Sequence, residues 1–439
     1  MSSPRIRHAL VGAMATAVAL TLAACSSASG ESADAAAVAT AADVSQCEPA
    51  GTTLDVAYNV LAAEPMELAI ANLEEAHPGL EVEGEPIAST AYPELTQQIV
   101  ADIAVGNRPD LIMTGLGQLP FWVAEYDPAV LDTSVLPETY QTQFLGAGTI
   151  DGEVYLAPSQ ISAPVMAVNQ DLLDAAGAGK AGDIKTYDDL LEVAQKVTDH
   201  TGQPSVSIPP QGLPEWFSQG LIQNSGGTLV NEDGTAAFGD ATGVAALDIW
   251  SELARRGLEA GLPGTADAVS AFSTGTLGVA MITTSNIAAI NEGIGDGFGW
   301  MPIQLPSVDG EQGRALPAGG NGWIVLSEDA CRAAFASELV GELLSPEAVM
   351  LASGTQRSYI PVDTVARDEL LASPEANPQM TFAWTFETEL TPWGGFDGSH
   401  TAQVNDALLY MVEQLQAGAE TKAVVDEAVA AIDRIVGGN

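Results

Sequence analysis

The chain has 439 residues, with 58 acidic and 14 basic side chains and a formal net charge of −44. This length allows two or three domains with a substantial core. The anionic balance disfavours nucleic acids, anionic lipid surfaces and polyanionic substrates as partners, and we interpret the charge itself as compositional bias or salt adaptation rather than a functional device.

The first 24 residues have the pattern of a secretory signal. Arg5 and Arg7 precede an apolar run over 9–22, which is too short to span a membrane but suits the core of an export signal. The following Leu22-Ala23-Ala24-Cys25 is similar to the lipobox of bacterial lipoproteins, which implies cleavage before Cys25 and a lipid on its thiol. The alternative is an ordinary signal with a chance cysteine. We expect an exported protein, held by a lipid at the outer face of the cell membrane.

A tether follows the predicted anchor. Residues 26–46 contain no aromatic side chain and too little apolar surface to order themselves, so we assign residues 25–48 to the lipidated cysteine and a flexible tether. In an oxidising compartment Cys47 and Cys331 favour one long-range disulfide, with a buried free thiol at Cys331 as the alternative. The cysteine spacing does not suit a zinc or iron–sulfur site.

Strands and helices alternate along the rest of the chain. Apolar spacing predicts, in chain order, a strand over 54–60, a helix over 66–73, a strand at 80–82, a helix over 95–103 and a buried strand over 110–113. Thr186 to Asp189 read as a capped helix start, strands are expected at 278–283 and 322–326, and helices at 404–415 and 424–435. This alternation predicts an α/β fold with parallel-type sheets covered on both faces.

Motifs for catalysis and for cofactors are incomplete. Gly177 to Lys180 look like half of a phosphate loop, but Ala181 replaces the required Ser or Thr, so we interpret Gly177 as a helix terminator. Alternating glycines over 293–299 miss the dinucleotide-binding spacing and suggest a loop. We therefore expect no cofactor, no metal and no enzyme activity, although paired carboxylates for glycoside cleavage stay open among so many acids.

Aromatic residues near predicted loop ends suggest a different kind of site. A sugar needs flat rings against its C–H face and neutral donors and acceptors around its rim. For each single aromatic residue core packing is the alternative, and Trp216-Phe217 is the best candidate for a ligand platform because a proline-rich stretch precedes it. The aromatic residues considered are Tyr92, Trp122, Trp216, Phe217, Trp300, Trp323, Tyr359, Trp384 and Trp393.

The order of several short segments resembles the extracellular solute-binding proteins of ATP-driven importers, in the carbohydrate branch, with the glycerol-3-phosphate binders most alike. The segments include 106–113, 157–177, 186–190, 231–234, 272–281, 319–322 and 358–361. The resemblance implies a type II periplasmic-binding-protein-like fold with two α/β lobes and a hinge. The first lobe would comprise 49–157 and 318–350, and the second 160–315 and 352–439.

The resemblance also implies a ligand site in the cleft between the lobes. The implied ligand-binding residues are Tyr92, Gly115, Leu116, Ser162, Trp216, Phe217, Ser285, Asn286, Gly319, Gly320, Asn321, Tyr359 and Asp397. Where the glycerol-phosphate binders carry an arginine late in the chain, this sequence offers Asp397, which suits sugar hydroxyls and not a phosphate. Arg357 is a candidate contact if the ligand does carry phosphate.

These features predict the substrate-binding lipoprotein of an ABC transporter. It would act as a monomer, capture a neutral sugar or short oligosaccharide and deliver it to the permease subunits. The first alternative is a glycerol-3-phosphate or glycerophosphodiester binder. The others are an extracellular glycan hydrolase and a surface adhesin or sensor that lacks a permease.

Overall fold

The computed structural model describes residues 41, 43–84, 86–89, 91–211, 213–354 and 357–438. The predicted signal and Cys25 lie outside the described residues, so the lipidation stays a prediction. In the described part of the chain, no helix is long and apolar enough to cross a membrane.

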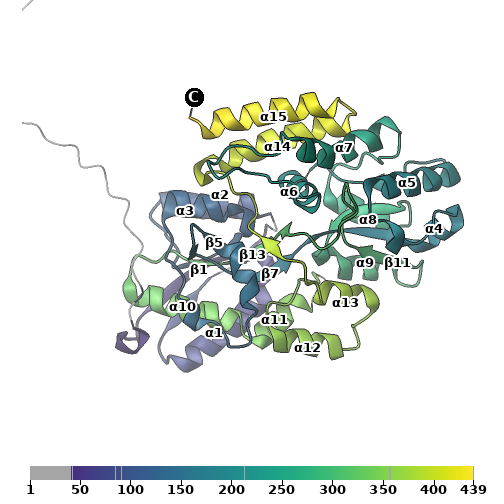
Figure 1. The fold of residues 1–439 in the computed structure, drawn as a ribbon. Helices are drawn as coiled ribbons and strands as arrows, with labels where there is room; N and C mark the ends of the chain where they lie inside the picture. The colour runs from purple at the N-terminus through teal and green to yellow at the C-terminus, as the bar shows by residue number, and fades with distance from the viewer. Residues whose placement is uncertain are drawn as a thin grey trace, which may run out of the picture. The chain divides into compact units, whose positions relative to one another are not determined.

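The first sheet is built mainly from the N-terminal third of the chain (Figure 1). Its strand order is β2-β1-β4-β13-β7, and β3 also pairs with β1. The strands are β1 (Thr53–Asn59), β2 (Glu81–Glu83), β3 (Pro86–Ile87), β4 (Leu111–Gly115), β7 (Ala157–Ser162) and β13 (Gly319–Val325). Strands β1 to β4 pair in parallel, as predicted, but β13 runs antiparallel to both of its neighbours. The parallel expectation is therefore wrong for β13, which returns from far along the chain.

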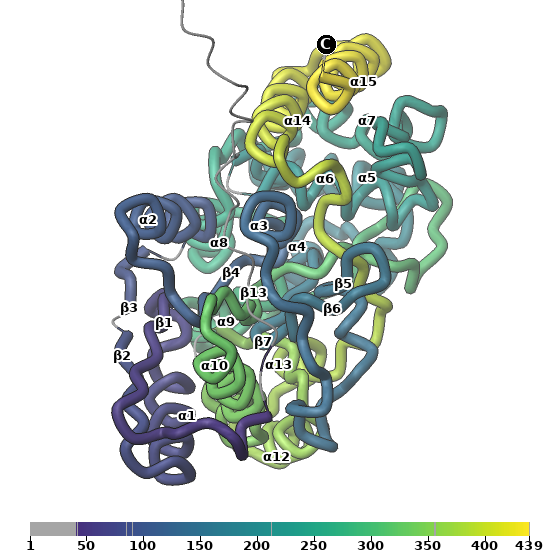
Figure 2. Tube along the Cα trace, turned by 90° about the vertical axis from the view of Figure 1, so that its left-hand side faces the viewer, coloured from purple at the N-terminus to yellow at the C-terminus, as the bar shows by residue number. Residues whose placement is uncertain are grey.

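Helices cover this first sheet. Helix α10 contacts α1, β1 and β13, and α2 contacts β1 and β4; α1 and α10 lie side by side in Figure 2. The helices are α1 (Ala63–Ala76), α2 (Tyr92–Ala104), α3 (Leu119–Tyr126), α10 (Ala330–Leu343) and α11 (Pro346–Ser353). A small hairpin joins β5 (Thr149–Ile150) and β6 (Glu153–Val154) beside the 3-10 segment η5 (Thr142–Gly148).

The second sheet has the order β11-β8-β10-β9. Its strands are β8 (Pro164–Asn169), β9 (Val206–Ser207), β10 (Val279–Thr283) and β11 (Trp300–Ile303). Strand β8 is antiparallel to β10 and β11, so the parallel expectation is wrong for β8, while β9 and β10 pair in parallel. The other helices before the last two are α4 (Gln170–Ala176), α5 (Tyr187–Thr201), α6 (Pro214–Asn224), α7 (Ala241–Arg255), α8 (Thr265–Ser273), α9 (Ile287–Ile294), α12 (Thr364–Ala372) and α13 (Pro378–Trp384), and α12 contacts α11 and α13.

Local signals set several helix ends as predicted. The Thr186 hydroxyl accepts from Asp189 N–H, and the Asp189 carboxylate accepts from Thr186 N–H, so the capping box forms at the start of α5. Gly177 ends α4 in the left-handed conformation, with φ of 63°, which explains the glycine at this position and confirms it as a helix terminator.

Chain crossings between the two sheets lie close together. Ser162 ends β7 and Pro164 begins β8, so only Ala163 separates the strands. A second crossing precedes β13, where β12 (Leu316–Pro317) pairs with β14 (Leu390–Thr391). Ile161 also bridges to Ile360. The strand ends and the loops that follow them therefore meet in the same region.

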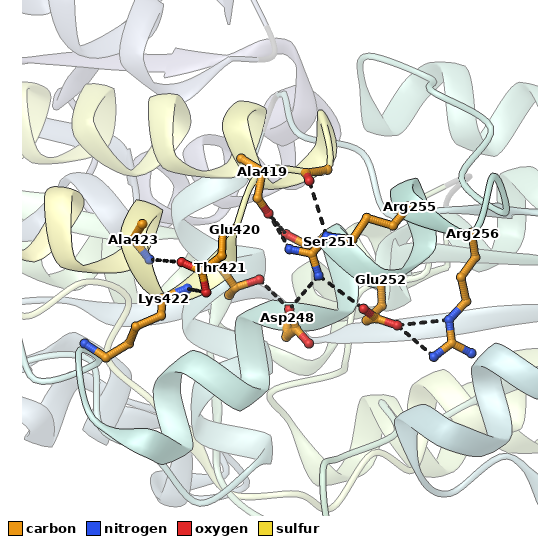
Figure 3. Close-up of polar contacts among 11 residues, drawn as sticks. Asp248, Ser251, Glu252, Arg255, Arg256, Ala419, Glu420, Thr421, Lys422 and Ala423 are labelled. Atoms are coloured by element: carbon orange, nitrogen blue, oxygen red, sulfur yellow. Dashed lines mark hydrogen bonds and ion pairs between the residues drawn. The ribbon is translucent and has the colours of Figure 1, made fainter.

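The last two helices are fastened to α7. Helices α14 (Thr401–Gln416) and α15 (Thr421–Val436) contact each other and α7. Figure 3 shows how Arg255 donates to the Ala419 carbonyl at 2.6 Å, while Ser251 donates to the same carbonyl at 3.0 Å. These bonds satisfy the Ala419 carbonyl at the turn between the two helices.

Cys47 and Cys331 form a disulfide, which joins the segment before β1 to the start of α10. The end of the predicted tether departs from a flexible chain, because Val44 to Gln46 form the 3-10 turn η1, which Asp43 caps through Ser45 N–H. The covalent link to Cys331 holds this segment, which the composition of residues 26–46 does not indicate.

Candidate ligand-binding site

A cavity of about 480 Å³ opens where the loops of the two sheets meet. Its size falls within the range of about 300–1,000 Å³ that is common for small-molecule sites. The described residues that line it are Leu61, Ala91, Tyr92, Pro93, Gly115, Gly117, Gln118, Ser162, Leu213, Glu215, Trp216, Gly264, Thr265, Ala266, Thr283, Ser285, Asn286, Gly319, Gly320, Arg357, Tyr359 and Trp393.

Two indole rings form an aromatic wall. Trp216 stands on the first turn of α6, and its Nε1 donates to the Pro317 carbonyl at 3.0 Å, which fixes the ring. Trp393 lies in the loop after β14. The centroid of its ring lies 5.7 Å from that of Trp216, at an interplanar angle of 42°. Gln219 on α6 binds the backbone on both sides of Trp393. Its Nε2 donates to Pro392 O and its Oε1 accepts from Gly394 N–H, each at 2.9 Å.

Glycines allow the rings to approach the backbone. A Cβ on Gly319 would lie 2.6 Å from Trp216 Cζ2, and one on Gly117 would lie 2.7 Å from Trp393 Cδ2. Both spacings are shorter than carbon atoms tolerate, so the rings need glycine at these positions. Gly320 has a φ of 104°, and a Cβ there would lie 1.7 Å from Gln160 O.

Two tyrosines form a polar side of the cavity. Asn321 Nδ2 donates to the Tyr92 hydroxyl at 2.9 Å and to Gln160 Oε1 at 2.7 Å. Burial raises the pKa of Tyr92 and of Tyr359, so both phenols are neutral at physiological pH. They offer hydrogen bonds without charge.

The charged groups at the cavity are few. Among the described lining residues, Glu215 is the acid and Arg357 the base. Burial raises the pKa of Glu215 to about 7, because removing water disfavours the charged carboxylate.

Hydroxyl and amide groups complete the lining. They come from strand ends or the turns after them: Ser162 ends β7, Thr283 ends β10, and Ser285 and Asn286 follow in η7 (Thr284–Asn286). Asn286 Oδ1 accepts from Thr283 N–H at 3.1 Å, which orients the amide.

Most residues implied by the sequence are brought to this cavity, and their contact with a ligand stays a prediction. Those that line it are Tyr92, Gly115, Ser162, Trp216, Ser285, Asn286, Gly319, Gly320 and Tyr359. Leu116 and Phe217 are buried beside it, and Phe217 packs its ring against Trp216 at 5.6 Å. Asn321 supports Tyr92 from behind.

Asp397 is not brought to the cavity. It is exposed and caps the 3-10 segment η8 (Gly398–His400), accepting from Ser399 N–H at 2.9 Å. Those bonds also keep the pKa of Asp397 below its ordinary value. The role expected for it as an acceptor of sugar hydroxyls therefore has no geometric support at this position.

Glu215, Gln118, Thr265 and Thr283 line the cavity although sequence reasoning did not select them. Glu215 directly precedes Trp216, and Thr283 ends a predicted strand, so both carried a positional signal. Trp393 was considered only as one of many aromatics. For Thr265 we find no signal in the sequence.

The family model of bacterial extracellular solute-binding proteins matches residues 69–381 of this chain. The chain belongs to this family. Its structure matches, with a TM-score of 0.71 and 18% identity, that of the cyclic alpha-maltosyl-1,6-maltose binding protein from Arthrobacter globiformis, covering 88% of this chain and 99% of the other. UgpB from Mycobacterium tuberculosis, solved with glycerophosphocholine, gives a TM-score of 0.72 at 18% identity over 89% and 99%. These matches confirm the two-lobed α/β fold expected from the sequence.

A curated relative of this solute-binding protein is the arabinooligosaccharide-binding protein of Halalkalibacterium halodurans, which is 26% identical over 103 residues. The match covers 24% of this chain and 22% of that relative. The match thus spans about a fifth of the length of that relative. The members of the matched family are described as extracellular solute-binding proteins.

Proposed function

We propose that this solute-binding protein captures a carbohydrate, a neutral sugar or short oligosaccharide, outside the cell and delivers it to the permease of an ATP-driven importer. The cavity walled by Trp216 and Trp393 carries this proposal, because indole rings suit the C–H face of a sugar. Tyr92, Tyr359 and Asn286 supply neutral groups for its hydroxyl rim. The matched proteins named for arabinooligosaccharide and cyclic maltosyl-maltose binding are consistent with this ligand class.

The closure of two lobes over the ligand would couple capture to delivery. Tyr92 and Gly115 come from the elements of the first sheet, and Ser285 and Trp216 from those around the second. A ligand that contacts both groups at once binds the closed state more tightly than the open one, and only that difference shifts the population. The predicted lobe boundaries belong to this proposal.

The protein would act without changing its ligand. A glycoside hydrolase of the usual kind needs two carboxyl groups flanking the scissile bond, whereas the described lining offers Glu215. Export, the lipid on Cys25, attachment to the outer face of the membrane and a monomeric state complete the proposal.

A thermal-shift series tests the ligand class, since a ligand that binds only the folded state raises the melting temperature with concentration. The panel contains arabinotriose, maltotriose, glycerol 3-phosphate and glycerophosphocholine. We expect a neutral sugar to raise the melting temperature and to be recovered unchanged after incubation. A flat response to every sugar, or conversion of the bound sugar, would contradict the proposal.

Arg357 favours a second candidate, a glycerophosphodiester. A guanidinium suits a phosphate, Arg357 lines the cavity, and UgpB was solved with glycerophosphocholine. Stabilisation by glycerophosphocholine and not by the two sugars would select this candidate.

A further inference from the structure

Glu215 is a partly buried acid on the cavity wall, and no other residue in the described part of the chain donates to it. It stands on the first turn of α6, between Pro214 and Trp216, and lines the cavity. Among the described residues, no other residue donates a hydrogen bond to its carboxylate. A buried carboxylate keeps its charge readily only when donors surround it. The donors it lacks can come from a ligand in the cavity.

The ionised groups near α6 do not compensate Glu215. Helix α6 packs against α7, α14 and β12, and none of the described ion pairs includes Glu215. At the end of α7, Arg255 and the next residue Arg256 both pair with Glu252, and Arg255 also pairs with Asp248 (Figure 3).

The other titratable groups near α6 come from α14 and from the cavity lining. On α14, Asp406 and Glu413 are exposed. On the cavity side the titratable groups are Arg357 and the neutral phenols Tyr92 and Tyr359. Burial is thus the main influence on Glu215, and it raises the pKa of the carboxyl group to about 7.

We infer that Glu215 selects ligands rich in hydrogen-bond donors, and that binding such a ligand drives the proton from its carboxyl group into the solvent. Solute capture is then coupled to the release of a proton. This inference rests on the proposed function, because it needs a donor-bearing ligand in this cavity. Sugar hydroxyls and an ammonium group share the chemistry that a carboxylate accepts.

The direction of the coupling follows from linkage. Below pH 7 the carboxyl group of the free protein is mostly protonated, while the donors of the ligand favour the ionised form. Affinity should therefore be highest above pH 7 and fall as the pH drops, by at most about tenfold per pH unit. A phosphate ligand would act in the opposite direction, since an anion beside Glu215 favours the protonated acid.

Isothermal titration calorimetry measures the coupling directly. Maltotriose and arabinotriose are titrated at pH 6.0 and pH 8.5, and glucosamine at pH 6.0, where its amine is protonated, each in two buffers of different ionisation enthalpy. At pH 6.0 we expect the apparent enthalpy to depend on the buffer, corresponding to release of up to about one proton, and at pH 8.5 to be independent of it. Comparison of the two trisaccharides with glucosamine separates hydroxyl donors from an ammonium donor.

Two matched variants locate the proton. Glu215→Gln keeps the shape but cannot ionise, so it should abolish the release and flatten the pH dependence of affinity. Glu259→Gln is the control, because burial also raises the pKa of Glu259 to about 7, yet this residue does not line the cavity. It should keep the release.

The outcomes separate the inference from the proposed function. Sugar binding without proton release, or with equal release in Glu215→Gln, overturns the role of Glu215 and leaves the proposed function standing. Absence of binding by every sugar overturns the proposed function, and the inference with it.

Discussion

The centroids of the indole rings of Trp216 and Trp393 lie 5.7 Å apart, although Trp216 belongs to α6 and Trp393 to the loop after β14. Gln219 holds that loop onto α6, while the ring of Trp393 rests against Gly117 beside the first sheet. The aromatic wall is therefore assembled from three distant segments. Its shape depends on their relative positions.

Trp393→Ala should weaken binding of the best sugar by about tenfold or more, because it removes one ring from the wall and buried aromatic contacts dominate such sites. Isothermal titration calorimetry gives the affinity, and thermal unfolding shows that the variant is folded. Trp300→Phe is the control, since Trp300 packs against Phe272 away from the cavity. Equal affinity in Trp393→Ala and wild type would remove Trp393 from the site.

Gly319→Ala should lower both stability and affinity. The added Cβ would lie 2.6 Å from Trp216 Cζ2 and 2.8 Å from Ser162 Oγ, and overpacking of this kind costs about 1–3 kcal/mol. Gly182→Ala is matched to it, because Gly182 has nothing within 4 Å of the corresponding position. A Gly319→Ala variant as stable and as tight in binding as Gly182→Ala would show that the wall relaxes freely.

Local sequence patterns predicted the elements that carry the site better than the site itself. The capping box at Thr186, the terminator at Gly177 and the strand ending at Thr283 follow from short-range chemistry. The antiparallel placement of β13 depends on where a distant segment returns, and local spacing carries no such information.

The same distinction explains the two carboxylates. The family resemblance selected Asp397 as a ligand-binding residue. In the structure its carboxylate instead accepts a hydrogen bond from the N–H of Ser399. Glu215 is one of 58 acids in the sequence, and only the packing of α6 turns it toward the cavity. Which acid faces the cavity is decided by tertiary contacts, and the position of Glu215 beside Trp216 was the only signal for it in the sequence.

Replacing both cysteines by serine should destabilise the protein without changing sugar affinity. The disulfide joins residues 284 positions apart, and a native disulfide typically contributes about 2–4 kcal/mol, more for longer loops. Neither Cys47 nor Cys331 lines the cavity. Chemical denaturation measures the loss, and calorimetry the affinity. Unchanged stability would mean that other contacts of η1 hold this segment.

Glu259→Gln should reduce the pH dependence of stability. The Glu259 carboxylate accepts from Ile208 N–H at 3.1 Å and from Gly261 N–H at 3.2 Å, but burial still raises its pKa to about 7. A carboxyl group with a folded-state pKa above its unfolded value contributes stability below pH 4.5, and that contribution is lost as the pH rises through 7. The wild type should therefore lose about 2–3 kcal/mol between pH 5 and pH 8 that the variant keeps. Urea unfolding at both pH values measures the difference, and Asp397→Asn serves as a control at an exposed acid. An identical pH dependence of stability in Glu259→Gln and wild type would contradict this prediction.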